Sequence, residues 1–251
     1  MDVSTGMNKT VLYITDNQLD GRIDTLCKKN IIESIGDLPL ISVSQKPIDF
    51  GENICVGGMG RSSLIINIQM KKGLEKVKTE FIAIAEHDCL YTPEHFLFTP
   101  LGNVFWYNEN VWALQYTSII KPQFDGMFSF FKGRKANSQL ICRTDIMIKA
   151  TQDRIDMMSD PDWLKKYPLG RIGEAGAMKY EQVAKLATGE SVQHIRKKLE
   201  EYVYKYEGKN WSTKNPNVDI RHNNNFTKNR RGIKRTYEIP YWKKMDDIFN
   251  L

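Results

Sequence analysis

The sequence predicts an α/β fold: a mixed β-sheet with flanking helices, followed by a helical or irregular C-terminal region. Three observations support this prediction. Strand-length apolar runs alternate with helix-length segments through the first third of the 251 residues. Two strand-like runs lie close together in the middle of the chain, and polar residues dominate after Gly208. Strands separated by helices favour a parallel sheet with right-handed crossovers, whereas strands joined by a short turn favour a hairpin.

The first third is predicted element by element from the spacing of its apolar residues. A strand over 11–14 is followed by a helix over 21–35, in which Ile23, Leu26 and Ile31 recur near helical spacing. A second strand over 38–43, a Gly-rich loop at 56–60 and a helix from Leu64 to Val77 come next. The apolar run 81–85 is then typical of a buried parallel strand.

The remaining residues show weaker patterns. Pro93 predicts the start of a helix, and residues 104–107 and 111–116 predict two strands joined as a hairpin near 108–110. We expect a mobile loop over 124–135 and a strand or short helix over 139–148. Helices are predicted over 153–164, 174–187 and 191–206, with Ser191 as a cap for the last. Secondary structure is predicted to be weak from Gly208 onward.

Composition indicates a soluble globular protein with one domain and an appendage. The chain is 41% hydrophobic and 26% charged, values that are ordinary for such proteins. No run approaches the roughly 20 apolar residues of a membrane span, and residues 1–9 lack the apolar core of a signal peptide. The four cysteines are scattered without a CxxC pair, which favours reduced thiols in a cytoplasmic protein without a zinc site.

Positive charge is concentrated near the C-terminus. The net charge is +6, and residues 209–235 contain eight Lys or Arg and one acid, Asp219. Such a concentration indicates an anionic partner, either nucleotide phosphates, nucleic acid or a membrane surface. A solvated tail is the alternative interpretation.

The tripeptide Glu86-His87-Asp88 directly follows the strand predicted over 81–85. Open α/β sheets bind ligands at the carboxyl ends of their strands. Divalent cations such as Mg²⁺ or Mn²⁺ prefer carboxylate oxygens and usually bind together with a substrate phosphate. The tripeptide is therefore a candidate metal–diphosphate site, and the alternative is that its acids cap the next helix or face solvent.

Together, these segments resemble the nucleotide-sugar domain of GT-A (Rossmann-like) glycosyltransferases. The resemblance covers roughly residues 10–100: a strand ending in Thr15-Asp16-Asn17, the loop Gly60-Arg61-Ser62 with its helix, and the strand ending in Glu86-His87-Asp88. In that family an Asp-x-Asp motif binds Mn²⁺ or Mg²⁺, which clamps the donor diphosphate. The resemblance implies that Asp88 ligates the metal and that Glu86, a departure from Asp, contacts the ribose or the metal. It assigns no role to His87.

The same resemblance implies two halves. Residues 1–120 would bind the nucleotide sugar, and residues 121–251 would bind the acceptor, with the basic C-terminal segment closing over the donor. Several GT-A enzymes supply a further metal ligand from a C-terminal histidine, and His222 resembles it. Because imidazole suits Mn²⁺ better than Mg²⁺, the metal prediction leans toward Mn²⁺. An inert, exposed histidine is the alternative.

The other donor-site candidates are polar or basic. Arg221, Arg230 and Arg231 could hold the diphosphate, because guanidinium groups match phosphate oxygens. The residues that end the first strand, Thr15, Asp16 and Asn17, lie where a pyrimidine or ribose would sit, although such residues also form turns and caps. Arg61 and Ser62 could contact the base or phosphates, and ordinary helix capping is their alternative role.

An inverting transferase also needs a base for the acceptor hydroxyl. Glu174 is the candidate because glycines surround it in residues 170–176. Asp145 and Asp125 compete with it. A helix-start glutamate near a positive dipole is the alternative for Glu174.

The sequence leaves the acceptor open. Aromatic residues among basic ones near the C-terminus (Trp211, Phe226, Tyr237, Tyr241 and Trp242) favour DNA, whose bases stack on such side chains. The Asp-Ile-Arg-His segment resembles the phage-type and base-J-type DNA glucosyltransferases. This implies a UDP-sugar donor, a hydroxymethylated pyrimidine acceptor flipped out of the duplex, and, for a phage protein, the host cytoplasm.

Other classes stay open at this stage. A cell-envelope glycan or lipid acceptor is one alternative, although the sequence shows no amphipathic basic helix. A nucleotidyltransferase and a non-catalytic DNA-binding protein are the others. The sequence does not predict an oligomeric state.

Overall fold

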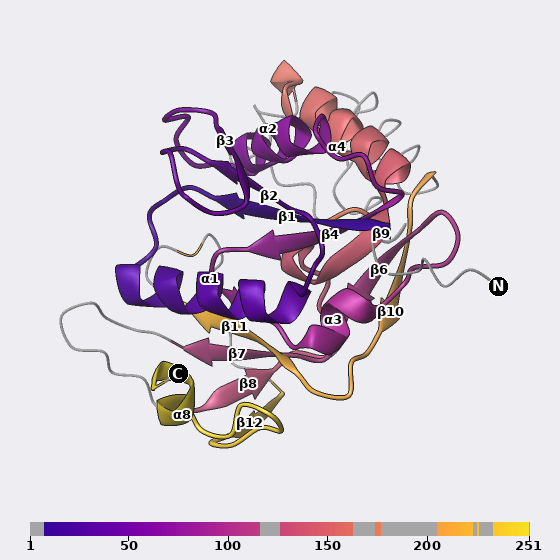
Figure 1. Cartoon of the computed structure of the whole chain (residues 1–251). Coiled ribbons are helices and arrows are strands. Elements are labelled where there is room, and N and C mark those ends of the chain that lie inside the picture. The colour runs from indigo at the N-terminus through magenta and orange to yellow at the C-terminus, as the bar shows by residue number, and fades with distance from the viewer. Residues whose placement is uncertain are drawn as a thin grey trace.

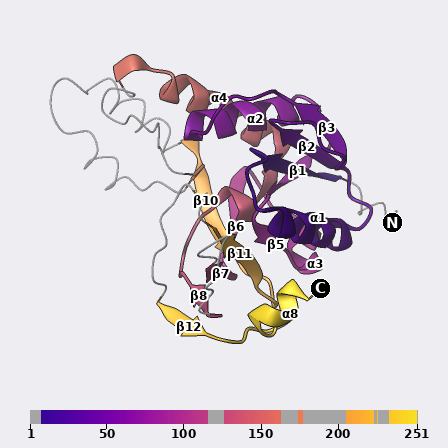
Figure 2. The same ribbon diagram turned by 90° about the vertical axis from the view of Figure 1, so that its left-hand side faces the viewer.

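The structure is a computed structural model of the chain, and it describes residues 8–115, 126–162, 174–176, 205–222, 225 and 233–250. Two β-sheets lie one above the other, with a helix between them (Figure 1). The same arrangement is seen from the side in Figure 2, where the C-terminal helix lies at the end of the molecule that carries the smaller sheet.

The larger sheet has seven strands in the order β10-β6-β9-β4-β1-β2-β3. Their bounds are β1 Lys9–Thr15, β2 Leu40–Ser44, β3 Glu52–Cys55, β4 Phe81–Glu86, β6 Val104–Asn108, β9 Leu140–Arg143 and β10 Glu207–Trp211. The smaller sheet has five strands in the order β12-β8-β7-β11-β5. These are β5 Cys89–Leu90, β7 Val111–Gln115, β8 Phe128–Phe130, β11 Asn217–Arg221 and β12 Lys234–Thr236.

The helices are α1 Gly21–Ile35, α2 Ser63–Leu74, α3 Pro93–Leu97, α4 Thr144–Met158 and α8 Met245–Phe249, with a 3₁₀ turn at Asn137–Gln139. Successive side chains of a strand point to opposite faces. On β1, Leu12 packs with α2 and α4, whereas Tyr13 packs with α1. The first half of α1 also packs on the smaller sheet, through Ile23 and Cys27. The helix α1 therefore joins the two sheets.

The order of the parallel strands places a crevice between β1 and β4. From β1 the chain moves outward to β2 and β3, and then returns through α2 to β4 on the other side of β1. Both neighbours pair parallel to β1, with Thr15 opposite Ser44 and Ile14 opposite Glu86. Such a reversal of strand order is where open α/β sheets bind ligands.

The smaller sheet brings a distant segment to this crevice. After β4 the chain turns at residues 87–88 into β5, which pairs antiparallel with β11 so that Cys89 lies opposite Asp219. The backbone amide of Ile220 donates to the carbonyl of Asp88 over 2.7 Å. As a result, residues 219–222 lie beside the end of β4.

The structure confirms the predicted mixed α/β sheet with flanking helices. The predicted helix over 21–35 has the observed bounds of α1, and the apolar run 81–85 forms a buried parallel strand. The strand or helix predicted over 139–148 is a strand followed by a helix, which continues through the first part of the helix predicted over 153–164.

Three predictions were wrong. The runs 104–107 and 111–116 do not form a hairpin, because β6 pairs with β9 and β10 while β7 pairs with β8 and β11. The segment expected to be a mobile loop contains strand β8, and the C-terminal region contains β10, β11, β12 and α8. Strand β3 was not predicted, because it is short and its half-exposed residues showed no strand pattern. The helices predicted over 174–187 and 191–206 fall mostly outside the described residues.

Candidate active site

A pocket of about 350 Å³ lies over the carboxyl ends of β1 and β4. Nine residues predicted from the sequence line it: Thr15, Asp16, Arg61, Ser62, Glu86, Asp88, Glu174, Arg221 and His222. Segments that are far apart in the chain therefore meet in one cavity. The lining residues that were not predicted include Arg134, Asn137, Arg154 and Asn225.

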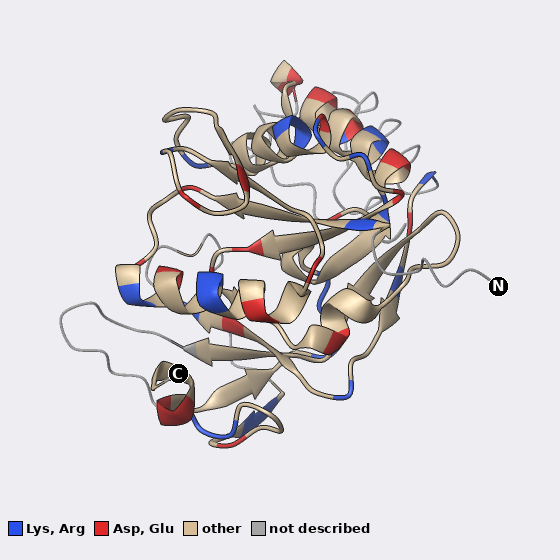
Figure 3. Ribbon diagram, in the orientation of Figure 1, with Lys and Arg blue, Asp and Glu red and all other residues tan. Residues whose placement is uncertain are grey.

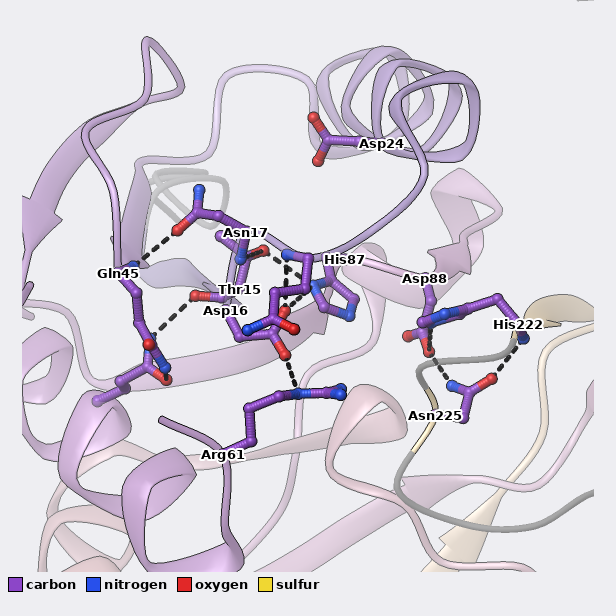
Figure 4. A network of polar contacts seen from close by, with 12 residues as sticks. Thr15, Asp16, Asn17, Asp24, Gln45, Arg61, His87, Asp88, His222 and Asn225 are labelled. Carbon is purple, nitrogen blue, oxygen red and sulfur yellow. Dashed lines mark hydrogen bonds and ion pairs between the residues drawn. The ribbon is translucent and has the colours of Figure 1, made fainter. Parts of the chain in front are cut away.

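An ion pair between Arg61 and Asp16 lies on the β1 side of the pocket (Figure 4). The Nε atom of Arg61 is 2.5 Å from Oδ2 of Asp16. The other carboxylate oxygen of Asp16 is 3.7 Å from Nδ1 of His87, which also lies 2.8 Å from Oγ1 of Thr15. Thr15, Asp16, Arg61 and His87 thus form one polar network that connects β1 with the turn after β4.

Asn17 has a structural role. Its side-chain oxygen accepts hydrogen bonds from the backbone amides of Gln45 and Lys46, each over 2.8 Å. Its backbone is in the left-handed region, with φ of 59°, which asparagine tolerates better than most residues. Asn17 is not among the residues that line the pocket. It therefore holds the loop after β1 against the loop after β2.

The first turn of α2 faces the pocket. Ser62 caps this helix by accepting a hydrogen bond from the amide of Ile65 over 3.1 Å. Ser62, Ser63, Ile65 and Ile66 all line the cavity. The amino end of a 12-residue helix carries a partial positive charge and free amide donors, which suit an anionic group such as a phosphate.

Asp88 is a buried acid with several polar contacts. Its side chain is buried, and its Oδ2 accepts a hydrogen bond from Nδ2 of Asn225 over 2.7 Å and lies 3.4 Å from Nε2 of His222. The side-chain oxygen of Asn225 in turn accepts a hydrogen bond from the backbone amide of His222 over 2.5 Å. Burial raises the pKa of Asp88, but the hydrogen bond with His222 and the charges of His87 and Arg221 outweigh it and hold this pKa below its ordinary value. Asp88 is therefore ionised at neutral pH.

Asp88, His222 and His87 form a group with ligand atoms that lie within 4.8 Å of one another. Imidazole nitrogen and carboxylate oxygen are ligands for divalent transition metals, so the donor set fits Mn²⁺. The resemblance had placed Glu86 in this group, and the geometry does not. Residues 87 and 88 form a turn, and Glu86 is not in the group of ligand atoms, although it lines the same pocket as Asp88.

Glu86 has a different environment at the end of β4. Burial and the nearby charges of Asp88, Glu174 and Asp219 raise its pKa well above the ordinary value, and Arg134 only partly opposes them. A raised pKa favours the protonated carboxyl group, which can donate a hydrogen bond. In that form Glu86 suits a ligand hydroxyl or carbonyl.

Two partly buried ion pairs also line the pocket. Arg134 donates to Oδ2 of Asp219, which also lies 3.6 Å from Nε of Arg221. Arg154, on α4, is buried, and its Nη1 atom lies 3.4 Å from Oε2 of Glu174. The sequence contains no signal for Arg134 or Arg154, because neither belongs to a motif and each reaches the pocket only through tertiary folding.

Asp145 lies away from the pocket. Strand β9 runs antiparallel to β4, so its last residue, Arg143, lies opposite Phe81 at the amino end of β4. Asp145 follows in the first turn of α4, where it is exposed and paired with Arg143 at 3.1 Å. Asp145 is therefore not among the residues that line the pocket, whereas Glu174 is. Arg230, Arg231 and Asp125 lie outside the described residues.

The aromatic residues expected to stack on bases divide into two groups. Trp242 is buried and donates from Nε1 to the carbonyl of Pro216, and Trp211 stacks on Phe98. Tyr237 and Tyr241 are exposed. Among the described residues, no helix combines the length and apolarity that a membrane span requires.

Comparisons with known proteins find similarity only at the level of structure. No protein-family model matches the chain, and no curated protein matches its sequence. A glycosyltransferase involved in the glycosylation of the major capsid of PBCV-1 is 10% identical, with a TM-score of 0.37, over 64% of this chain and 72% of that one.

Two other solved structures are similar to the same degree. The glycosyltransferase GlyE of Streptococcus pneumoniae TIGR4 is 11% identical (TM-score 0.38), over 81% of this chain and 46% of that one. The bifunctional IspDF of Campylobacter jejuni is 13% identical (TM-score 0.32), over 71% and 53% respectively. The chain thus spans about half the length of these two proteins. Values this low assign neither a family nor an activity, so the function rests on the geometry of the site.

Proposed function

We propose that this protein is a GT-A-type glycosyltransferase that transfers a sugar from a nucleoside diphosphate donor, most simply a UDP-sugar, to an acceptor hydroxyl. The observation that carries the proposal is the convergence in one pocket of three features. These are the metal-capable group around Asp88, the amino end of α2, and the arginines Arg61, Arg134 and Arg221. A diphosphate with a divalent cation needs this combination of charges.

In this proposal Asp88 and His222 would hold a divalent ion, Mn²⁺ in preference to Mg²⁺, which when bound would supply positive charge to the diphosphate leaving group. The amino end of α2 and Arg221 orient the phosphate oxygens by direct hydrogen bonds. Thr15, Asp16 and Arg61 lie beyond them on the β1 side of the pocket, where the ribose and base would bind. Asn225 positions Asp88 through its 2.7 Å hydrogen bond.

The acceptor chemistry uses the two other carboxyl groups. Glu174 lines the pocket and is only partly buried, with its side chain 28% exposed, so an incoming hydroxyl can reach it. We assign it as the base that removes the acceptor proton. Glu86, whose surroundings favour the protonated form, donates a hydrogen bond to a sugar hydroxyl.

The test is a thermal-shift panel of UDP-, GDP- and ADP-glucose, each with and without Mn²⁺. A ligand that binds the native state raises its apparent stability, by about 2.7 kcal/mol at 100 times Kd. We expect one nucleotide sugar to stabilise the protein only when Mn²⁺ is present. A panel in which no nucleotide sugar shifts the melting temperature, with or without metal, would reject the proposed activity.

For the acceptor we propose a hydroxymethylated pyrimidine in DNA, encountered in the cytoplasm. Support comes from β12 and the turn before α8, where Lys and Arg gather (Figure 3). Ile233, Lys234, Arg235 and Tyr237 are all exposed there. Basic and aromatic side chains together bind unpaired nucleotides. Salt-dependent binding and transfer to hydroxymethylated but not unmodified DNA is expected, and transfer only to a glycan or lipid acceptor would replace this proposal.

A further inference from the structure

His87 occupies the centre of the polar network, although its sequence context assigns it no role. It lies in the turn between β4 and β5, and its side chain is 14% exposed. Its ring lies 6.0 Å from the ring of His222, centroid to centroid, at an angle of 63°. One of its ring nitrogens belongs to the group of ligand atoms that lie within 4.8 Å of one another, together with Asp88 and His222.

One nitrogen of His87 is held by the β1 side of the pocket. Nδ1 lies 2.8 Å from Oγ1 of Thr15 and 3.7 Å from the carboxylate of Asp16. The Thr15 hydroxyl is itself oriented, because its oxygen accepts a hydrogen bond from the backbone amide of Asn17 over 3.0 Å. A carboxylate near Nδ1 favours the tautomer with the proton on Nδ1, which leaves the lone pair on Nε2.

This arrangement is typical of metal-binding histidines. Such a histidine usually donates its second ring N–H to an oxygen, which fixes its tautomer and the orientation of its ring. Here the oxygens come from Thr15 and Asp16, and Asp16 is in turn paired with Arg61 at 2.5 Å. The Nε2 atom of His87 therefore has its lone pair available to bind a cation beside Asp88.

We propose that His87 is a metal ligand and that the site consists of two imidazoles and one carboxylate, His87, His222 and Asp88. This set differs from a pair of acids and has a different selectivity. Oxygen-rich sites suit Mg²⁺, Ca²⁺ and Mn²⁺, whereas a site with imidazole ligands binds transition metals more tightly, Co²⁺ and Zn²⁺ more so than Mn²⁺. The site should therefore bind these ions in preference to Mg²⁺.

The inference deepens the proposed glycosyltransferase function but is tested without turnover. Isothermal titration of the intact protein with Mn²⁺, Co²⁺ and Mg²⁺ gives the selectivity directly. The visible absorption of bound Co²⁺ reports its ligands. We expect Co²⁺ and Mn²⁺ to bind at least about 10-fold more tightly than Mg²⁺. Equal affinity for all three ions would overturn the inference.

Two variants identify the ligand. His87→Ala should weaken Co²⁺ binding about 100-fold, change the Co²⁺ spectrum and affect Mg²⁺ little, because it removes a nitrogen ligand. Thr15→Val, which leaves the imidazole in place but removes its hydrogen-bond partner, should weaken Co²⁺ binding about 10-fold. Asp145→Asn, outside the pocket, is the control and should not change metal binding.

The outcomes separate this inference from the proposed function. If His87→Ala binds Co²⁺ with unchanged affinity and spectrum, His87 is not a ligand, although metal-dependent transfer through Asp88 and His222 stands. If His87→Ala does not fold, as judged by circular dichroism, Thr15→Val and the metal series on the native protein still decide. If the native protein binds no divalent ion, both this inference and the proposed metal dependence fail.

Discussion

Replacing Asp88 with asparagine tests the centre of the site with the smallest change in shape. The substitution removes a negative charge and retains an oxygen that can accept the hydrogen bond of Asn225. Asp88 is only 6% exposed, so solvent screens its interactions weakly. The variant therefore separates the charge of this side chain from its packing.

The expected loss of stability follows from the contacts of the carboxylate. The net lowering of the Asp88 pKa means that its surroundings favour the ionised form in the folded protein. A hydrogen bond to a charged group contributes about 1.5–3 kcal/mol, and the contact with Asn225 is retained in part. We expect Asp88→Asn to lower the free energy of unfolding by about 1–3 kcal/mol, which corresponds to about 2–4 °C of melting temperature per kcal/mol.

The dependence of this difference on pH has a defined sign. A carboxyl whose folded pKa is depressed stabilises the fold above its unfolded pKa, here the ordinary value of 3.8. The contribution is lost as the pH falls through the lower pKa of the folded state. Urea unfolding of the native protein and Asp88→Asn should therefore differ at pH 7 and converge toward acid pH.

The effect on metal binding should be larger than the effect on stability. The introduced side-chain amide is a neutral ligand in place of the one carboxylate of the group, so Mn²⁺ affinity is expected to fall more than about 100-fold, or about 3 kcal/mol. Isothermal titration measures this change, and donor stabilisation in the thermal-shift panel should disappear with it. Asp145→Asn is the matched control, because it removes an exposed carboxylate paired with Arg143 and should change stability by at most about 0.5 kcal/mol.

One pattern of results would exclude this role for Asp88. An Asp88→Asn variant that folds, binds Mn²⁺ within about twofold of the native protein and transfers sugar at the native rate would remove Asp88 from the site. A variant that unfolds at room temperature would instead show that the carboxylate is needed for folding. In that case the loss of metal affinity would have to be measured with Asp88→Glu.

Three further predictions test other parts of the molecule. Glu174→Gln should lower kcat by about 10²–10⁴-fold and leave donor affinity unchanged, since a general base acts only in the chemical step; unchanged kcat in steady-state kinetics would exclude it as the base. Gly73→Ala should destabilise the fold by about 1–3 kcal/mol in urea unfolding, because the added Cβ would lie 2.3 Å from Cδ1 of Leu12. The same change at Gly21, which has no atom within 4 Å of an added Cβ, is the control and should be neutral or stabilising. Burial lowers the pKa of Lys9 from 10.5 to about 8, so the unfolded chain binds more protons between these values and stability should rise by about 3 kcal/mol as the pH rises through them. A flat pH profile, or the same rise in Lys9→Met, would contradict this.

The elements that the sequence predicted best are those determined by local patterns. The helix over 21–35 could be predicted within its observed bounds, because its apolar residues recur at helical spacing and Gly36 follows it with φ of 58°. The buried strand β4 was visible as an apolar run for the same reason. Each of these patterns is formed by residues that are close together in the sequence, so it can be recognised without knowing which segment packs against it.

Strand pairing could not be predicted in this way. Strands β6 and β7 are separated by a short turn, which suggested a hairpin, yet neither pairs with the other and both pair with strands far along the chain, β10 and β11. Strand β10 lies at the edge of the larger sheet, where its side chains are largely exposed and show no apolar alternation. Its backbone hydrogen bonds to β6 determine its conformation, and backbone groups are the same in every sequence.

The same distinction between local patterns and tertiary contacts applies to the candidate site. The position of Asp88 could be inferred from local sequence, since an acid after a buried parallel strand is at the ligand-binding edge of the sheet. Its neighbours could not be inferred in this way: His222 was suggested only by the family resemblance, and the contacts of Asn225 and His87 with this group form only when the chain folds. A pattern of residue types encodes which face of an element is buried. The contacts between side chains depend instead on how the β4–β5 turn and the β5–β11 pairing place distant segments in space.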